Sequence, residues 1–89
     1  MLLTSLADTS RLRDWARARV LVGLGSDDEV RAARRQFADL ENVMFVVGDR
    51  GEIPWQDRFF SIIVDAGNTE PSPAMLRCLL HDGRIVTGE

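Results

Sequence analysis

The sequence has 89 residues, of which 45% are hydrophobic and 28% charged, a composition typical of one small globular domain that excludes a disordered or collagen-like segment. All 11 basic residues are arginine, and 14 acidic residues bring the net charge to −3, so the chain has no overall attraction for nucleic acid or anionic membranes. Because a domain of this size buries roughly 60–68% of its unfolded surface, we expect one domain over residues 1–89 with some apolar surface left for a partner.

The sequence carries few signals for targeting, metal binding or redox chemistry. The segment Met1–Leu6 lacks the basic leader and long apolar run of a signal peptide, and no later run approaches membrane-spanning length. The single cysteine, Cys78, excludes an internal disulfide, and the single histidine, His81, leaves no cluster of metal ligands. We therefore expect a cytoplasmic protein that binds no metal and does not contact a membrane.

The first third of the chain predicts a helix, a strand and a second helix. Residues 9–18 carry apolar side chains at helical spacing, and residues 20–22 form a short apolar run typical of a buried strand. That run ends in the turn Gly23-Leu24-Gly25. Ser26 and Glu29 then have the spacing of a capping box, which predicts that a helix begins there.

The middle of the chain predicts two strands joined by an unusual connection. Asn42 ends the second helix, and residues 43–47 are a continuous apolar strand. Residues 48–58 show neither helical nor strand periodicity, so we expect a crossover loop that lacks a full helix. Residues 59–64 form the next strand.

The last third predicts one more helix and one more strand. Ser72 and Pro73 have the residue types of an N-cap and a first helical position, and apolar residues follow at helical spacing through Leu80. Gly83 marks a turn, and residues 84–87 form a strand. This order predicts an α/β fold: a three-layer Rossmann-like domain with a four-stranded, mainly parallel sheet and about three helices.

In such sheets, ligands bind beyond the carboxyl ends of the strands. The turn containing Gly23 and Gly25 allows backbone amides to approach a ligand, although the same glycines are equally typical of a simple tight turn. The acidic residues Asp27, Asp28 and Glu29 follow on the first helical turn and would repel a phosphate. The pattern therefore disfavours nucleotides and dinucleotides, but not an uncharged or cationic ligand.

Two aspartates stand at the ends of predicted strands. Asp49 follows the strand at residues 43–47, and Asp65 follows the strand at residues 59–64. Either carboxylate could accept hydrogen bonds from an amine or a ribose hydroxyl held over the sheet, or could simply cap its own loop.

Several segments together resemble the second half of a class I S-adenosylmethionine-dependent methyltransferase. In order and at the family's spacing they are Asn42–Asp49, Glu52–Asp57, Phe60–Val64 and Met75–Val86, with Arg19–Arg35 added. The resemblance implies a Rossmann-like fold and S-adenosylmethionine as cofactor. It also implies that Asp49 binds the adenine amino group and that the backbone amide of Arg50 contacts the ring.

The first half of the sequence departs from that family. Val22 precedes Gly23-Leu24-Gly25-Ser26 where the family has an acidic residue, and Asp27 replaces the third glycine. No counterpart is evident for the carboxylate that the family places at the end of a second strand to bind ribose, although Asp28 or Glu29 could replace it. We therefore expect that one outer strand–helix unit is missing and that residues 20–24 form a central strand.

Our first hypothesis is a methyltransferase-like domain that binds S-adenosylmethionine weakly. Its candidate cofactor-binding residues are Gly23, Gly25, Asp28, Asp49, Arg50 and Asp65. No general base is identifiable, so methyl transfer would rest on positioning of the acceptor, whose identity the sequence does not give. The alternative is a non-catalytic remnant that acts as a homodimer or by binding a protein partner.

A third hypothesis is a receiver-like domain. The segments at residues 20–22, 27–31 and 63–65 also resemble parts of a response-regulator receiver, in which Asp65 would accept a phosphoryl group. Two features disfavour this hypothesis. The chain has no lysine for the usual phosphate contact, and residues 23–26 separate the acidic residues that begin at Asp27 from the end of the strand at residues 20–22.

Overall fold

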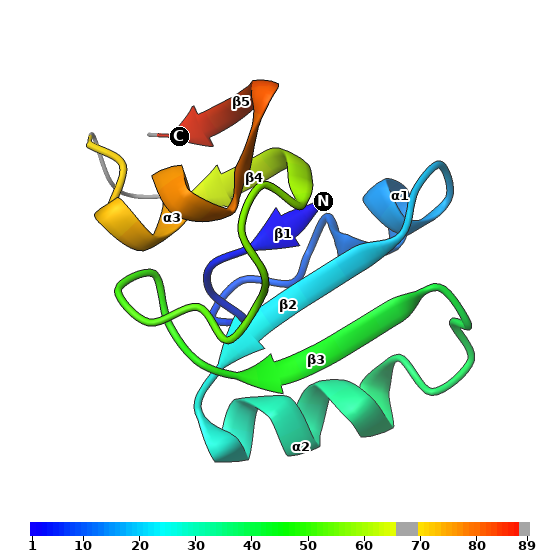
Figure 1. The fold of residues 1–89 in the computed structure, drawn as a ribbon. Coiled ribbons are helices and arrows are strands. Elements are labelled where there is room, and N and C mark those ends of the chain that lie inside the picture. The colour runs from blue at the N-terminus through cyan, green and yellow to red at the C-terminus, as the bar shows by residue number, and fades with distance from the viewer. Residues whose placement is uncertain (66–69, 88–89) are drawn as a thin grey trace.

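The five strands form one parallel sheet in the order β3-β2-β1-β4-β5 in the computed structural model, which describes residues 1–65 and 70–87 (Figure 1). The elements along the chain are β1 (Leu2–Leu3), α1 (Leu12–Ala16), β2 (Leu21–Gly25), α2 (Asp27–Gln36), β3 (Val43–Val47), β4 (Phe60–Asp65), α3 (Pro73–Cys78) and β5 (Leu79–Thr87). The predicted α/β, Rossmann-like fold is confirmed, with five strands in place of the expected four.

The additional strand is β1, which has only two residues and lies at the centre of the sheet. Leu2 pairs with Val22 of β2 on one side and with Ile63 of β4 on the other. The expectation that residues 20–24 form the central strand is therefore wrong. No strand–helix unit is missing ahead of α2 either, because β1 and α1 precede β2 and make it the second strand of the sheet.

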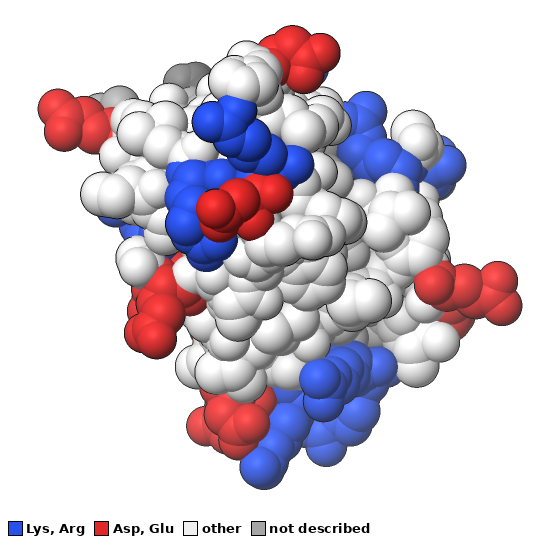
Figure 2. Space-filling model, in the orientation of Figure 1, with Lys and Arg blue, Asp and Glu red and all other residues white. Residues whose placement is uncertain are grey.

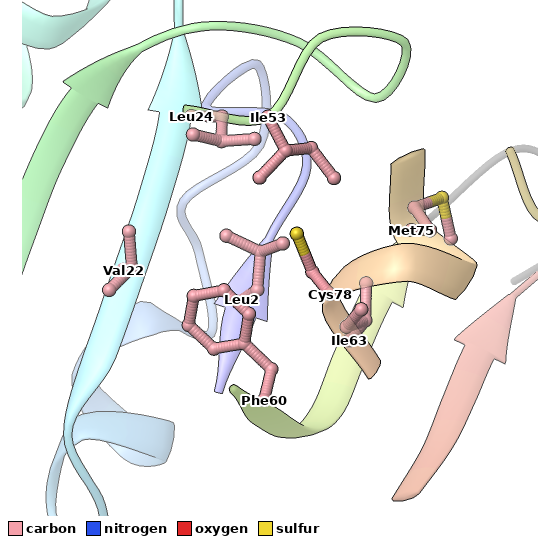
Figure 3. Packing of buried hydrophobic residues seen from close by; sticks show 8 residues of the cluster. All are labelled: Leu2, Val22, Leu24, Ile53, Phe60, Ile63, Met75 and Cys78. Atoms are coloured by element: carbon pink, nitrogen blue, oxygen red, sulfur yellow. The ribbon is translucent and has the colours of Figure 1, made fainter. Parts of the chain in front are cut away.

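Successive strand residues point to opposite sides of the sheet, and each side packs a cluster of buried residues. On one side, α3 and the loop after β3 cover a cluster that Figure 3 shows from close by: Leu2, Val22, Leu24, Ile53, Phe60, Ile63, Met75 and Cys78. On the other side, α1 and α2 cover Leu3, Leu6, Leu12, Leu21, Val30, Ala33, Phe37 and Phe45. Helix, sheet and helix thus form the three predicted layers.

Helix α2 begins as predicted. The Ser26 side chain accepts a hydrogen bond from the Glu29 backbone N–H at 3.2 Å, and Glu29 Oε1 accepts one from the Ser26 N–H at 2.9 Å. The helix ends at Gln36, earlier than expected, because Phe37 leaves the helical conformation. Asn42 instead donates its side-chain amide to the carbonyls of Ala16 and Arg19 and so joins the start of β3 to the segment after α1.

The other two helices are shorter than predicted. Helix α1 covers only the middle of the expected 9–18 segment. Helix α3 begins at the predicted Ser72 cap, but Leu79 is already extended and begins β5. Between Leu79, which pairs with Phe60, and Arg84, which pairs with Ile62, residues 80–83 bulge out of register, so β5 begins earlier than the predicted strand at residues 84–87.

Arginines and acidic residues are interspersed on the face of the molecule seen in Figure 2 rather than gathered into a patch of one sign. Three arginines form ion pairs with aspartates at the surface: Arg13 with Asp39, Arg31 with Asp27, and Arg77 with Asp57. None of the helices described has the length and apolar character needed to cross a lipid bilayer.

Candidate functional site

The strand order reverses at β1. From β1 the chain builds outward to β2 and β3, and it then crosses to the opposite side of β1 to form β4 and β5. The crossover over residues 48–58 contains no helix, as predicted, and its Ile53 packs into the core under the sheet. The carboxyl ends of the strands on both sides of the reversal therefore meet at one edge, where ligands bind in folds of this kind.

A cavity of about 530 Å³ opens at this edge, beyond the ends of β1, β2 and β3, and its size falls within the range of about 300–1,000 Å³ typical of small-molecule sites. The lining residues are Thr4, Ser5, Leu24, Gly25, Ser26, Glu29, Val47, Gly48, Asp49, Glu52 and Pro54. Two predicted site residues, Gly25 and Asp49, thus lie on one cavity. Among the residues that the structure describes, every charged one that lines the cavity is acidic.

Gly25 has no side chain, and the Glu29 side chain occupies the space that this leaves at the end of β2. A Cβ atom at Gly25 would lie 3.0 Å from Oε1 of Glu29 and 3.1 Å from its Cβ, so the Glu29 side chain folds over the glycine. The bond from the Ser26 N–H holds Oε1 in this position. The carboxylate above the end of β2 is therefore supplied by Glu29, whereas Asp28 is exposed and does not line the cavity.

Asp49 is held by its own turn. Its Oδ1 accepts hydrogen bonds from the N–H groups of Gly51 at 2.8 Å and Glu52 at 3.0 Å, and the backbones of Asp49 and Glu52 also bond to each other. Its Oδ2 takes no hydrogen bond from any residue that the structure describes, so this oxygen can accept one from a ligand.

Gly23 has a packing role. A Cβ atom there would lie 2.7 Å from the Leu6 side chain and 3.1 Å from Phe45. The glycine therefore allows Leu6 to pack closely on β2, and Gly23 does not line the cavity that Gly25 and Asp49 share.

Arg50 and Asp65 form a pair beside the cavity. Asp65 is 1% exposed and accepts a hydrogen bond from Thr4 Oγ1 at 2.6 Å. The Arg50 guanidinium donates to Asp65 Oδ2 from two nitrogens, at 3.0 and 2.9 Å, and also bonds the Glu70 carbonyl. The resemblance implies a role only for the backbone amide of Arg50, and no pattern in the sequence indicates this role of its side chain. Because Asp65 is buried and paired with Arg50, the structure does not favour the receiver-like hypothesis, in which Asp65 would accept a phosphoryl group.

The single cysteine and the single histidine of the sequence lie away from the cavity. Cys78 is buried in the core under α3, where burial raises the pKa of its thiol. His81 is exposed on β5 and contacts the Arg58 guanidinium. Within the described residues, no group of three histidine, cysteine, aspartate or glutamate side chains could hold a metal ion.

Comparison with known proteins shows a shared fold. No protein-family model matches this sequence, and no curated protein matches it. The YcgJ protein from Bacillus subtilis superposes with a TM-score of 0.75 at 20% identity, over 97% of this chain and 42% of that one. The PH0226 protein from Pyrococcus horikoshii OT3 superposes with a TM-score of 0.68 at 22% identity, over 97% of this chain and 47% of that one. The chain thus spans less than half the length of two larger proteins that contain its Rossmann-like fold.

Proposed function

We propose that this chain binds S-adenosylmethionine, weakly, in the cavity beyond the ends of β1, β2 and β3. The observation that carries the proposal is that Gly25 and Asp49, which come from separate segments of the sequence, line the same cavity. The resemblance of residues 42–86 to class I methyltransferases supports the same ligand.

The charge of the cavity suits this cofactor. Its carboxylates come from Glu29 on α2, Asp49 after β3 and Glu52 in the following loop. S-adenosylmethionine carries a cationic sulfonium, an ammonium group and one carboxylate, so its net charge is positive; it has hydroxyl and amino donors and no phosphate. Because Gly25 and Val47 are register partners, Glu29 and Asp49 lie over neighbouring strand ends and could accept hydrogen bonds from adjacent parts of one ligand.

Catalysis would place different demands on the chain. When bound, the cofactor supplies an electrophilic methyl group, and the protein must hold an acceptor in line with it. We assign the lining carboxylates to the cofactor, and the described residues that line the cavity include no histidine, so we propose no general base. Any transfer would depend on orientation of the acceptor and exclusion of water. The proposed function is accordingly that of a methyltransferase-like cofactor-binding domain, with the acceptor left open.

Isothermal titration calorimetry with S-adenosylmethionine and S-adenosylhomocysteine tests this proposal. We expect binding in the micromolar to millimolar range, with the cationic S-adenosylmethionine favoured severalfold over the uncharged sulfur of S-adenosylhomocysteine and the difference shrinking as salt is added. Absence of heat at millimolar ligand, with the protein shown to be folded by circular dichroism, would refute the proposal.

A second candidate function, homodimerisation, is favoured by an apolar groove on the α1 side of the sheet, which adjoins the cavity at Ser5. The groove has a volume of about 390 Å³, and its apolar lining residues are Leu3, Ala7, Trp15, Val64 and Val86. Helices α1 and α2 cover the β1–β3 side of this face, while Val86 on β5 remains 44% exposed. Sedimentation equilibrium should then show a dimer as concentration rises, and a monomer at every concentration would exclude this candidate.

A further inference from the structure

We infer that Asp65, acting through Arg50, is a positioning residue that fixes the Asp49 turn against the cavity. Its effect on ligand binding rests on the proposed function, whereas its effect on the turn can be measured without any ligand. Neither Asp65 nor Arg50 lines the cavity, so we assign their influence to the residues that they hold.

The contacts form a continuous connection between two walls of the cavity. Thr4, at the end of β1, lines the cavity and donates its hydroxyl to Asp65. Asp65 binds the Arg50 guanidinium through two nitrogens, a geometry that fixes both distance and orientation. Arg50 is the residue directly after Asp49, inside the turn that Asp49 and Glu52 close.

The backbone of Arg50 is held as well as its side chain. The Ser72 hydroxyl donates to the Arg50 carbonyl, and the Arg50 guanidinium bonds the Glu70 carbonyl. The turn is thereby attached at two points, Glu70 and Ser72, to the residues just before α3. The hydrogen bonds inside the turn set its shape, but they do not set the distance between the turn and β1. This distance determines the size of the cavity, because both segments contribute to its walls.

Burial of the Asp65 carboxylate strengthens this attachment. The Asp65 side chain is 1% exposed and the Arg50 side chain 36%, so solvent screens this charge-assisted pair less than it screens a fully exposed one. The exposed pair of Arg13 and Asp39, whose side chains are 49% and 63% exposed, has a similar contact distance of 2.8 Å. It lies away from the cavity and provides a matched control.

The test compares two double variants. R50M/D65N removes both charges while nearly preserving volume, so the core is not left with one unpaired buried charge. R13M/D39N removes the exposed pair in the same way. Backbone order parameters from ¹⁵N relaxation are then measured without ligand at Gly51 and Glu52, with Val30 in α2 as internal reference.

We expect the order parameters of Gly51 and Glu52 to fall from about 0.85, typical of rigid backbone, to below about 0.6 in R50M/D65N. Val30 should not change, and R13M/D39N should match the wild type at all three positions. Unchanged order at Gly51 and Glu52 in folded R50M/D65N would overturn the inference. If the double variant does not fold, the order parameters of Gly51 and Glu52 are measured in the single variant D65N, whose amide oxygen can still accept a hydrogen bond from Thr4. Unchanged order in D65N would overturn the inference in the same way.

A ligand measurement separates positioning from general stability. In the wild-type background, removing the pair should weaken S-adenosylmethionine binding roughly tenfold, the loss expected for one charged hydrogen bond. In a D49N background, where the positioned charge is already absent, the same change should cost little. Equal losses in both backgrounds would contradict action through Asp49. If the wild type binds no S-adenosylmethionine, the proposed function fails, and the order parameters still decide the inference.

Discussion

Glu29 and Asp28 are neighbours on the first turn of α2, yet they have different surroundings. The capping bond to Ser26 bends Glu29 back over Gly25 and into the cavity wall, whereas Asp28 points to solvent. From the sequence either carboxylate could replace the ribose-binding one, and the predicted site included Asp28 rather than Glu29, because spacing alone does not show which of them folds over the strand end. The glycine at position 25 is what creates the room for Glu29.

Substitution of Glu29 should therefore weaken ligand binding without weakening the fold. Gln at this position can still complete the capping box, so E29Q should leave the unfolding midpoint nearly unchanged. We expect it to reduce S-adenosylmethionine affinity about tenfold, because one charged acceptor is lost. Calorimetry of E29Q beside D28N checks this expectation, since D28N should bind like the wild type. Equal effects of the two variants would mean that Glu29 has no special place in the site.

Cys78 predicts a pH dependence of stability. Burial raises the pKa of its thiol, so the folded state holds this proton more tightly than the unfolded state does. The resulting stabilisation is complete below the unfolded thiol pKa and is lost as pH rises through the raised folded value. Urea unfolding of wild type and C78A at about pH 7 and about pH 10 tests this, and the advantage of the wild type should shrink at the higher pH. An advantage that does not change with pH would show that the thiol does not titrate differently in the two states.

At the scale of the elements, the long and regular segments could be predicted and the short ones could not. Strand β3 has the predicted bounds, and α2 begins at its predicted cap, because five apolar residues in a row and a capping box are local signals. Strand β1 has two residues, too few to show any alternation. It exists because β2 and β4 pair with it from both sides, and these partners lie far along the chain.

The difference between local signals and contacts of distant segments also explains which parts of the site could be predicted. Gly25 and Asp49 could be placed at one edge from sequence, because the ends of parallel strands meet there. The ion pair of Arg50 with Asp65 depends on the crossover that brings β4 beside β1, and no spacing in the sequence indicates it.

The central position of β1 can be tested by substitution. Leu2 is fully buried in the core under α3, so L2A should lower the free energy of unfolding by about 2–5 kcal/mol. Leu76, on the outer side of α3, is 56% exposed, and L76A should change stability by no more than about 0.5 kcal/mol. Urea denaturation of the two variants measures the difference, and a small effect of L2A would contradict the placement of β1 in the sheet.

At the scale of the whole molecule, the two faces of the sheet are covered unequally. The cavity at the strand ends and the apolar groove adjoin at Ser5, but their other lining residues differ. The charged residues described in the cavity lining are acidic, whereas the groove is lined mainly by apolar surface. The proposed cofactor binding and the proposed self-association can therefore be tested separately.

A charge placed in the groove should act on association alone. Because Val86 is 44% exposed, V86D should fold with little loss of stability. If two copies meet through this groove, the variant should remain monomeric at concentrations at which the wild type dimerises, and its affinity for S-adenosylmethionine should be unchanged. Sedimentation velocity and calorimetry measure the two properties, and a dimer that persists in V86D would place the contact elsewhere.

The short central strand also bears on how the protein is made. Leu2 and Leu3 leave the ribosome before the other strands of this sheet, but one of their two partners, β4, is synthesised only after residue 59. The backbone groups of Leu2 and Leu3 that pair with β4 therefore lack this partner through most of the synthesis of the sheet. The sheet is completed late, as is common where paired strands are distant in sequence. Slowing elongation after β3 should prolong the period in which the emerging polypeptide depends on chaperones.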